Sequence, residues 1–183
     1  VSKNDTDNAV IAGAFAVSLN KSGSKLGLAG AGSISYVTIA TNALLSNITF
    51  QDVGDVLVDS RTTGTTRSVA AGLGGATNGV GVAGSVAINA IDSTTTAKVR
   101  GGSIEASGLE VFALDVSRII AVAGAISYGG KAGVGVGVAY NEIVGGATAA
   151  LSGTLVDVGF GKVSVTAKNE SVITSVAAAV SAS

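Results

Sequence analysis

The sequence predicts an all-β fold, a right-handed parallel β-helix (β-solenoid), in a chain of 183 residues. Three observations predict it: segments repeat at a spacing of 52 residues, side chains alternate with a period of two, and proline is absent. In a solenoid, each rung forms backbone hydrogen bonds with the rungs on either side, about 4.8 Å away. Because a proline would remove a donor from that ladder, its absence favours stacked strands.

The repeat is clearest in a motif rich in glycine and valine. The segment GVGVGVAYNEI at 133–143 matches 81–91 and, more loosely, 30–39. Each of these copies ends 52 residues after the previous one. A fixed spacing of this kind is the mark of a repeat architecture. A β-propeller has a similar period, but its blades carry aromatic or charged signatures that this chain lacks.

Two further motifs support the period. The segment IAVAGAISY at 120–128 aligns with 11–19 and 174–182, and 111–118 returns as 163–170. We therefore divide the chain into repeat units at the following approximate boundaries: 9–67, 68–118, 119–171 and a partial unit at 172–183. We interpret the whole of 1–183 as one solenoid segment cut from a longer chain.

Within each repeat, large and small side chains alternate. Val134, Val136 and Val138 fall on one face of a strand, with glycines on the other. Clusters of turn-forming residues at 20–25, 77–79, 101–103, 129–133 and 159–161 predict strands of about five to nine residues. We expect two coils of about 26 residues per repeat, each triangular with three strands, and six to seven coils in all.

Two features suggest how such coils would stack. The glycines and alanines opposite the valine face predict a second packed surface, where only small residues fit. Asn89 and Asn141 occupy equivalent positions 52 residues apart. Asparagine side chains form hydrogen-bonded ladders along stacked strands, and they are also common in turns. Both interpretations of this pair stay open at this point.

Composition excludes several kinds of function. The chain contains no cysteine or histidine, which removes the usual zinc ligands and the catalytic triads that depend on histidine. A formal net charge of -1 predicts no binding to nucleic acid. The uncharged stretch at 68–91 is long enough for a membrane helix. Its matching copies elsewhere carry Lys21, Lys25 and Lys131, so we expect no membrane insertion of this segment.

The acidic residues offer the remaining candidate sites. Asp52, Asp55 and Asp59 have a spacing that suits Ca²⁺, but the chain lacks the glycine- and aspartate-rich repeat that wraps Ca²⁺ in a β-roll, which favours solvated charges in turns. Glu105 and Asp157 are also 52 residues apart, which places them two rungs apart in the expected coil, at about 9.6 Å. Paired carboxylates carry out glycoside hydrolysis. We expect solvated surface charges instead, and hence no catalytic, cofactor-binding or metal-binding residues.

The motifs at 120–128 and 133–143, with the ALSGT that follows at 150–154, resemble the repeats of very large leukotoxin-like filamentous adhesins. Such proteins are similar in plan to filamentous haemagglutinins and bacterial autotransporter passengers. The resemblance implies a β-helical rod, secreted across the outer membrane and displayed at the bacterial outer cell surface. It implies no catalytic residues.

We therefore expect a non-catalytic, extracellular structural or adhesive rod segment. Its partners would be a host-surface or glycan receptor, or further copies of itself joined end to end. The alternative function is a carbohydrate-active β-helix enzyme or a polysaccharide-binding module.

Overall fold

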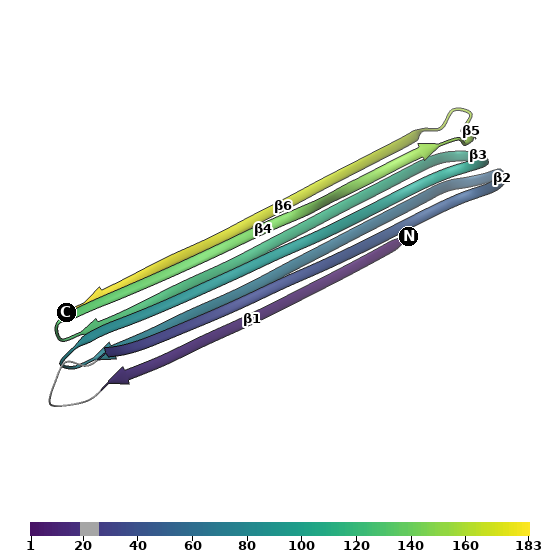
Figure 1. The fold of residues 1–183 in the computed structure, drawn as a ribbon. Helices are drawn as coiled ribbons and strands as arrows, with labels where there is room; N and C mark the ends of the chain where they lie inside the picture. Colours follow the sequence, from purple (N-terminus) through teal and green to yellow (C-terminus); the bar gives the residue numbers. More distant parts are fainter. Residues whose placement is uncertain (19–25) are drawn as a thin grey trace.

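The chain is all-β. A computed structural model describes residues 1–18 and 26–183, with 92% of residues in strands and no helix. The predicted turn at 20–25 lies outside the described residues. The elements run in the order β1 (Ser2–Ser18), β2 (Leu26–Ala76), β3 (Val80–Gly129), β4 (Ala132–Ser152), β5 (Leu155–Asp157) and β6 (Val163–Ala182). Figure 1 shows them as long, closely stacked rungs.

All the strands pair in parallel, as predicted. The sheet order is β1-β2-β3-β4, with β5 and β6 also paired to β3. Leu26 pairs with Val80, and Val80 pairs in turn with Ala132. These partners are therefore 54 and 52 residues apart, close to the spacing seen in the sequence. The parallel strands curl as one sheet, in a manner consistent with a β-solenoid.

The expected subdivision of each repeat is wrong. Among the described residues, no strand pairs with a segment about 26 residues away, so the repeat does not contain two stacked coils. Each long strand instead runs out, turns and returns, as Figure 1 shows for β2 and β3. The predicted triangular coil of short strands is replaced by a flat coil with two long arms. Because no proline interrupts the backbone ladder, each arm continues as one long strand.

The arms form two layers that face each other. Layer A contains 26–50, 80–104 and 132–157; layer B contains 2–18, 55–76, 109–129 and 163–182. A register shift between Phe50 and Val53 marks the turn in β2. The register partners of Phe50 and Val53 in β3 are Ile104 and Ala106. Shortly before them, Gly101 and Gly102 have φ of 67° and 82° within the strand. The predicted turn clusters are confirmed at 77–79, 130–131 and 159–161, whereas 101–103 belongs to β3.

A small buried cluster contains Ile91, Ile119 and Ala121. The main hydrophobic core lies beside the turns at 50–53 and 101–108. Its largest members are Val99, Ile104, Leu109 and Val111, each at most 1% exposed. Partly buried side chains from the same turns pack against them. Branched apolar side chains therefore hold the two layers apart at this end.

At the other end, the layers are held together by very small residues. Ala70, Ala87 and Ala123 form a buried cluster with 0% exposure. A Cβ atom added at Gly81 would overlap the backbone oxygen of Tyr128 on the facing layer. The prediction that glycine and alanine mark a second packed surface is confirmed. The large side chains of this half consequently point outward.

Candidate functional site

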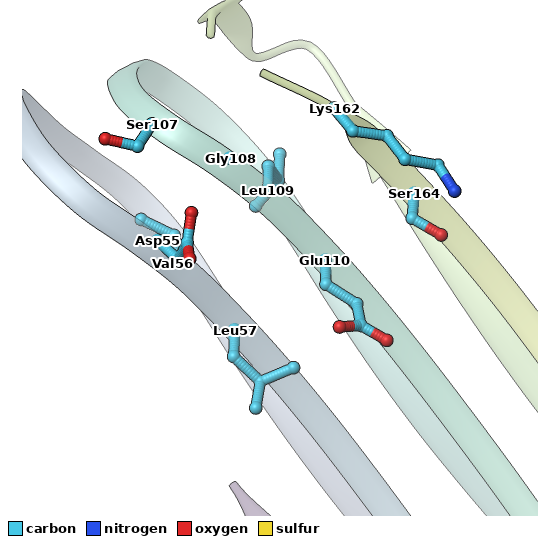
Figure 2. A pocket seen from close by; sticks show the side chains of 9 residues that line it. All are labelled: Asp55, Val56, Leu57, Ser107, Gly108, Leu109, Glu110, Lys162 and Ser164. Carbon is cyan, nitrogen blue, oxygen red and sulfur yellow. The ribbon is translucent and has the colours of Figure 1, made fainter.

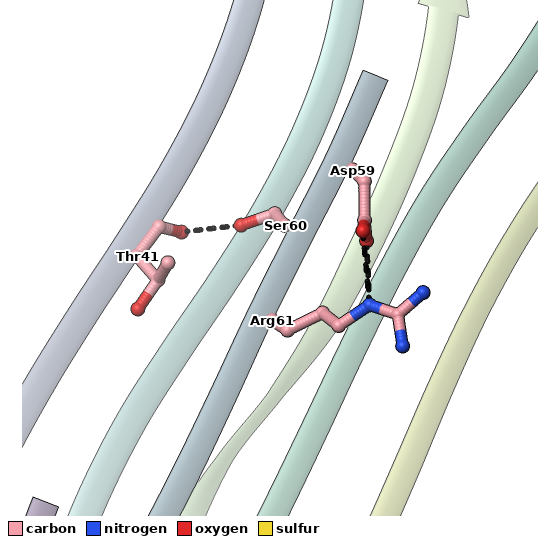
Figure 3. Close-up of polar contacts among 4 residues, drawn as sticks. All are labelled: Thr41, Asp59, Ser60 and Arg61. Carbon is pink, nitrogen blue, oxygen red and sulfur yellow. Dashed lines mark hydrogen bonds and ion pairs between the residues drawn. The ribbon is translucent and has the colours of Figure 1, made fainter. Parts of the chain in front are cut away.

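Between the two layers, a row of buried polar side chains separates the apolar core from the glycine-rich half. Thr62 donates from Oγ1 to Thr41 Oγ1 at 2.7 Å, and Thr95 donates to Thr62 at 2.6 Å. Ser60 donates to the backbone oxygen of Thr41 at 3.2 Å, a contact drawn in Figure 3. These bonds join layer A to layer B, so they fix how the two arms of a coil face each other.

Asp115 lies at the centre of this row and is 1% exposed. One carboxylate oxygen accepts from Ser117 Oγ at 2.8 Å, and the other accepts from Thr95 Oγ1 at 3.1 Å. On the next rung, Asn169 takes the position of Asp115, and Ser171 donates to its Oδ1 at 2.9 Å. The same polar pair is thus built twice, once with a carboxylate and once with an amide.

A second polar ladder runs through the glycine-rich half. Asn89 and Asn141 are register partners, and Asn89 Nδ2 donates to Asn141 Oδ1 at 2.8 Å. Both residues lie within long strands, so the structure decides for the ladder and against a turn. Asn8 donates to Ser35 at 2.7 Å, and Asn141 donates to Ser175 at 3.0 Å, which ties layer A to layer B here as well.

The aspartates that suggested a calcium site are spread over different surroundings. Asp59 accepts from Arg61 Nε through both carboxylate oxygens at 2.9 Å, and the guanidinium lies 4.9 Å from the Phe112 ring centre. Figure 3 shows Asp59 and Arg61 on the side of the strand away from Thr41. Asp52 and Asp55 line two separate hollows. Among the described residues, no three acidic side chains form a metal-ligand group.

Glu105 and Asp157 are closer together than we expected. They are direct register partners on β3 and β5, so they lie one rung apart and not two. The earlier spacing assumed two coils per repeat, which the pairing overturns. Together with Asp52, they line an open hollow of about 340 Å³. This is an acidic stack at the surface.

The largest hollow lies on the outer side of layer B, beside the same turns. It measures about 520 Å³, and its polar lining includes Asp55, Glu110, Lys162 and Ser164. Figure 2 shows these side chains spread along three successive rungs, with Leu57 among them. The groove carries charges of both signs and is open to solvent.

One titratable group is perturbed at the surface of layer A. Tyr140 donates from its hydroxyl to Glu142 Oε2 at 3.2 Å, and this hydrogen bond and the negative charge of Glu142 raise the pKa of Tyr140. The two residues share one face of β4, two positions apart. The effect belongs to an exposed pair.

Sequence reasoning missed the buried polar row and the contact between Arg61 and Phe112. The repeat did not signal the row, because the 52-residue spacing aligns Asp115 with Ala167. The structure instead pairs Asp115 with Asn169, 54 residues later. A period of two does not say which face of a strand is covered, so the sequence did not place these hydroxyl groups in the interior.

These features define the class: a parallel β-sheet protein that curls like a solenoid and carries polar ladders in its interior. No family model, curated protein or solved structure matches the chain. No helix in the described part of the chain could span a membrane.

Proposed function

We propose that this chain is a non-catalytic structural or adhesive rod segment of a large bacterial filamentous adhesin. The observation that carries the proposal is the unbroken parallel pairing on both layers, from β1 through β6. Each coil is stabilised mainly by its neighbours, which is how repeat proteins lengthen. Adding coils therefore makes the protein longer along the stacking axis, as a rod requires.

The finer parts of the proposal concern the coil and its location. The coil is right-handed, with a repeat of about 52 residues, which is the hand that parallel crossover connections almost always take. The extracellular location at the bacterial outer cell surface rests on the resemblance of the motifs at 120–128 and 133–143 to adhesin repeats. A host-surface or glycan receptor would bind to the exposed turns, because binding residues are often located on loops that a rigid scaffold positions.

Duplicating a rung tests the rod. Four extra copies of 80–131, inserted after Lys131, should preserve the register at Ala132. They should lengthen the particle by about 19 Å along one axis, since rungs are about 4.8 Å apart. Small-angle X-ray scattering measures this length, and electron microscopy of the lengthened rod reads its hand. A chain that widens in all directions, or unfolds, would contradict the proposal.

The alternative is a carbohydrate-active or polysaccharide-binding β-helix. It is favoured by Glu105 and Asp157, two carboxylates on adjacent rungs that line the same hollow. Glycoside hydrolysis uses such a pair of carboxylates. Incubation with acidic and neutral polysaccharides distinguishes the two functions, and we expect no turnover. Turnover that is lost in both Glu105→Gln and Asp157→Asn would establish the alternative.

A further inference from the structure

The outer side of layer B carries a regular apolar surface over the glycine-rich half. The rows that cross it from rung to rung, here called the layer B apolar face, are Ile11, Val69, Val122 and Val176; Gly13, Ala71, Gly124 and Ala178; and Phe15, Leu73, Ile126 and Val180. Two ridges of large side chains thus enclose a groove of glycine and alanine. The ridges are well exposed, with Ile11 at 82% and Phe15 at 73%.

This face exists because of how the interior is built. The facing layers of this half approach so closely that only glycine, alanine and small polar residues fit between them. The large apolar side chains therefore have no place inside their own coil. Solvent-exposed apolar area of this extent on a soluble protein marks a surface that is covered in use.

We propose that the layer B apolar face binds a second copy of this chain, so that two rods pack side by side. The occupant is argued from the face itself, which is self-complementary. Rows lie two residues apart, about 6.6 Å, on every strand. A copy shifted by one row places a ridge in the groove of its partner, and sheets stacked in this way lie about 10 Å apart.

Charge and area agree with a copy as the occupant. The four segments in register that build the face, 10–18, 68–76, 121–129 and 175–182, contain no charged residue, so two copies meet without repulsion. Arg67, at the border of the face, is paired with Asp7. Nine residues on four strands cover roughly 26 by 19 Å. Two copies would therefore bury about 1,000 Å² in total, the lower bound for a specific interface. Each further rung adds to this area.

The outer side of layer A is less suited to the same contact. This side also exposes large apolar side chains, such as Leu28 and Ile34. Its glycines, however, leave a hollow of about 390 Å³, against about 260 Å³ for the hollow on the layer B apolar face. Glu142 adds a charge on the last rung of the same layer. The outer side of layer B is therefore the proposed contact surface, and the outer side of layer A serves as the control surface in the experiments below.

Two matched lysine variants test the proposal. A side chain at Gly124 or at Gly32 meets nothing within 4 Å, so both positions accept lysine, the first in the layer B groove and the second outside layer A. In sedimentation equilibrium, we expect the parent to self-associate and Gly124→Lys to raise the Kd at least tenfold. Gly32→Lys should associate like the parent. Association unchanged in Gly124→Lys, or weakened equally in both variants, would overturn the proposal.

Single cysteines provide a second measurement, because the chain has none of its own. Gly124→Cys should be cross-linked into dimers by a bis-maleimide reagent of about 10 Å span, and Gly32→Cys should not. Because cysteine is smaller than lysine, the cross-linking result tests side-by-side pairing even if Gly124→Lys fails to fold. A parent that stays monomeric and instead binds phosphatidylcholine vesicles through this face would replace the copy with a lipid surface.

The inference goes beyond the proposed rod function and fails separately from it. Side-by-side pairing changes the mass of the particle, whereas inserting rungs changes the length of a single rod. Gly124→Lys with four inserted rungs should therefore still lengthen without pairing side by side. If it lengthens but the parent never pairs, the rod stands and this inference falls.

Discussion

Asn89 donates a side-chain hydrogen bond to Asn141, its counterpart 52 residues later on the next rung, at a distance of 2.8 Å. Asn89 is completely buried, and Asn141 passes the chain of contacts across to Ser175 on layer B. A polar side chain enclosed among alanines fixes which rung lies beside which, because a slipped register would leave the amide unpaired. The pair therefore specifies alignment as well as adding stability.

Removing the first member of the ladder should weaken the fold. Asn89→Ala loses one hydrogen bond within the interior, so the free energy of unfolding should fall by about 1 kcal/mol. Asn42→Ala, at an exposed position of the same layer, is the matched control and should change stability by less than about 0.5 kcal/mol. Urea unfolding measures both. Equal stability of the two variants would show that the ladder does not stabilise the chain.

The buried carboxylate of Asp115 should be replaceable by an amide and not by a methyl group. Asp115→Asn keeps an acceptor for Ser117, as Asn169 does for Ser171, so it should be at least as stable as the parent. Asp115→Ala removes the buried carboxylate that accepts from both Ser117 and Thr95, and it should cost about 1–3 kcal/mol. Thermal unfolding separates the two cases. An alanine variant as stable as the asparagine variant would contradict this account.

The close approach of the layers should make one glycine irreplaceable and a nearby one dispensable. A Cβ at Gly81 overlaps the backbone of Tyr128, so Gly81→Ala should destabilise the chain by about 1–3 kcal/mol. At Gly84 the nearest atom is 4.0 Å away, and Gly84→Ala should instead stabilise by about 0.5–1 kcal/mol. Chemical denaturation of both variants checks the difference. The prediction fails if both substitutions have the same sign.

The open edge of the last coil should promote end-to-end association of this 183-residue chain. Ala179 is exposed on β6, whereas its register partner Ala125 is buried one rung earlier. Ala179→Lys places a charge where the next coil would pack and should weaken association, because inward-pointing charges block edge pairing. Sedimentation velocity across a concentration series measures the effect, with Gly32→Lys again as the control. If Ala179→Lys associates as strongly as the parent, the exposed edge of β6 is not the surface through which the chains join end to end.

Much of the fold could be predicted because it depends on local pattern. The alternation in 133–140, the 52-residue spacing and the absence of proline were enough to predict parallel stacked strands. The turns at 77–79 and 129–133 followed from glycine-rich composition. The coil size was wrong because the 52-residue repeat was divided into two coils, whereas residues 52 to 54 apart are direct neighbours in the sheet. Gly72 and Gly74 continue an extended strand whose facing layer lies too close for a side chain.

The candidate sites depended on pairing that no single segment encodes. Glu105 and Asp157 were recognised as equivalent, but their separation required knowing the coil length. Asp59 was grouped with Asp52 and Asp55 by spacing, yet Arg61 and Phe112 determine its surroundings.

By itself, the sequence determined the class of backbone: extended, parallel, repeating, and with small residues on one face of each strand. Only the tertiary structure decided which face is inside. Large apolar side chains are usually expected in the core, yet Phe15 and Ile126 point outward while Ala70 and Ala123 are enclosed. The reason is physical: a period of two separates the faces of a strand, but the distance to the opposite layer decides which face can be buried.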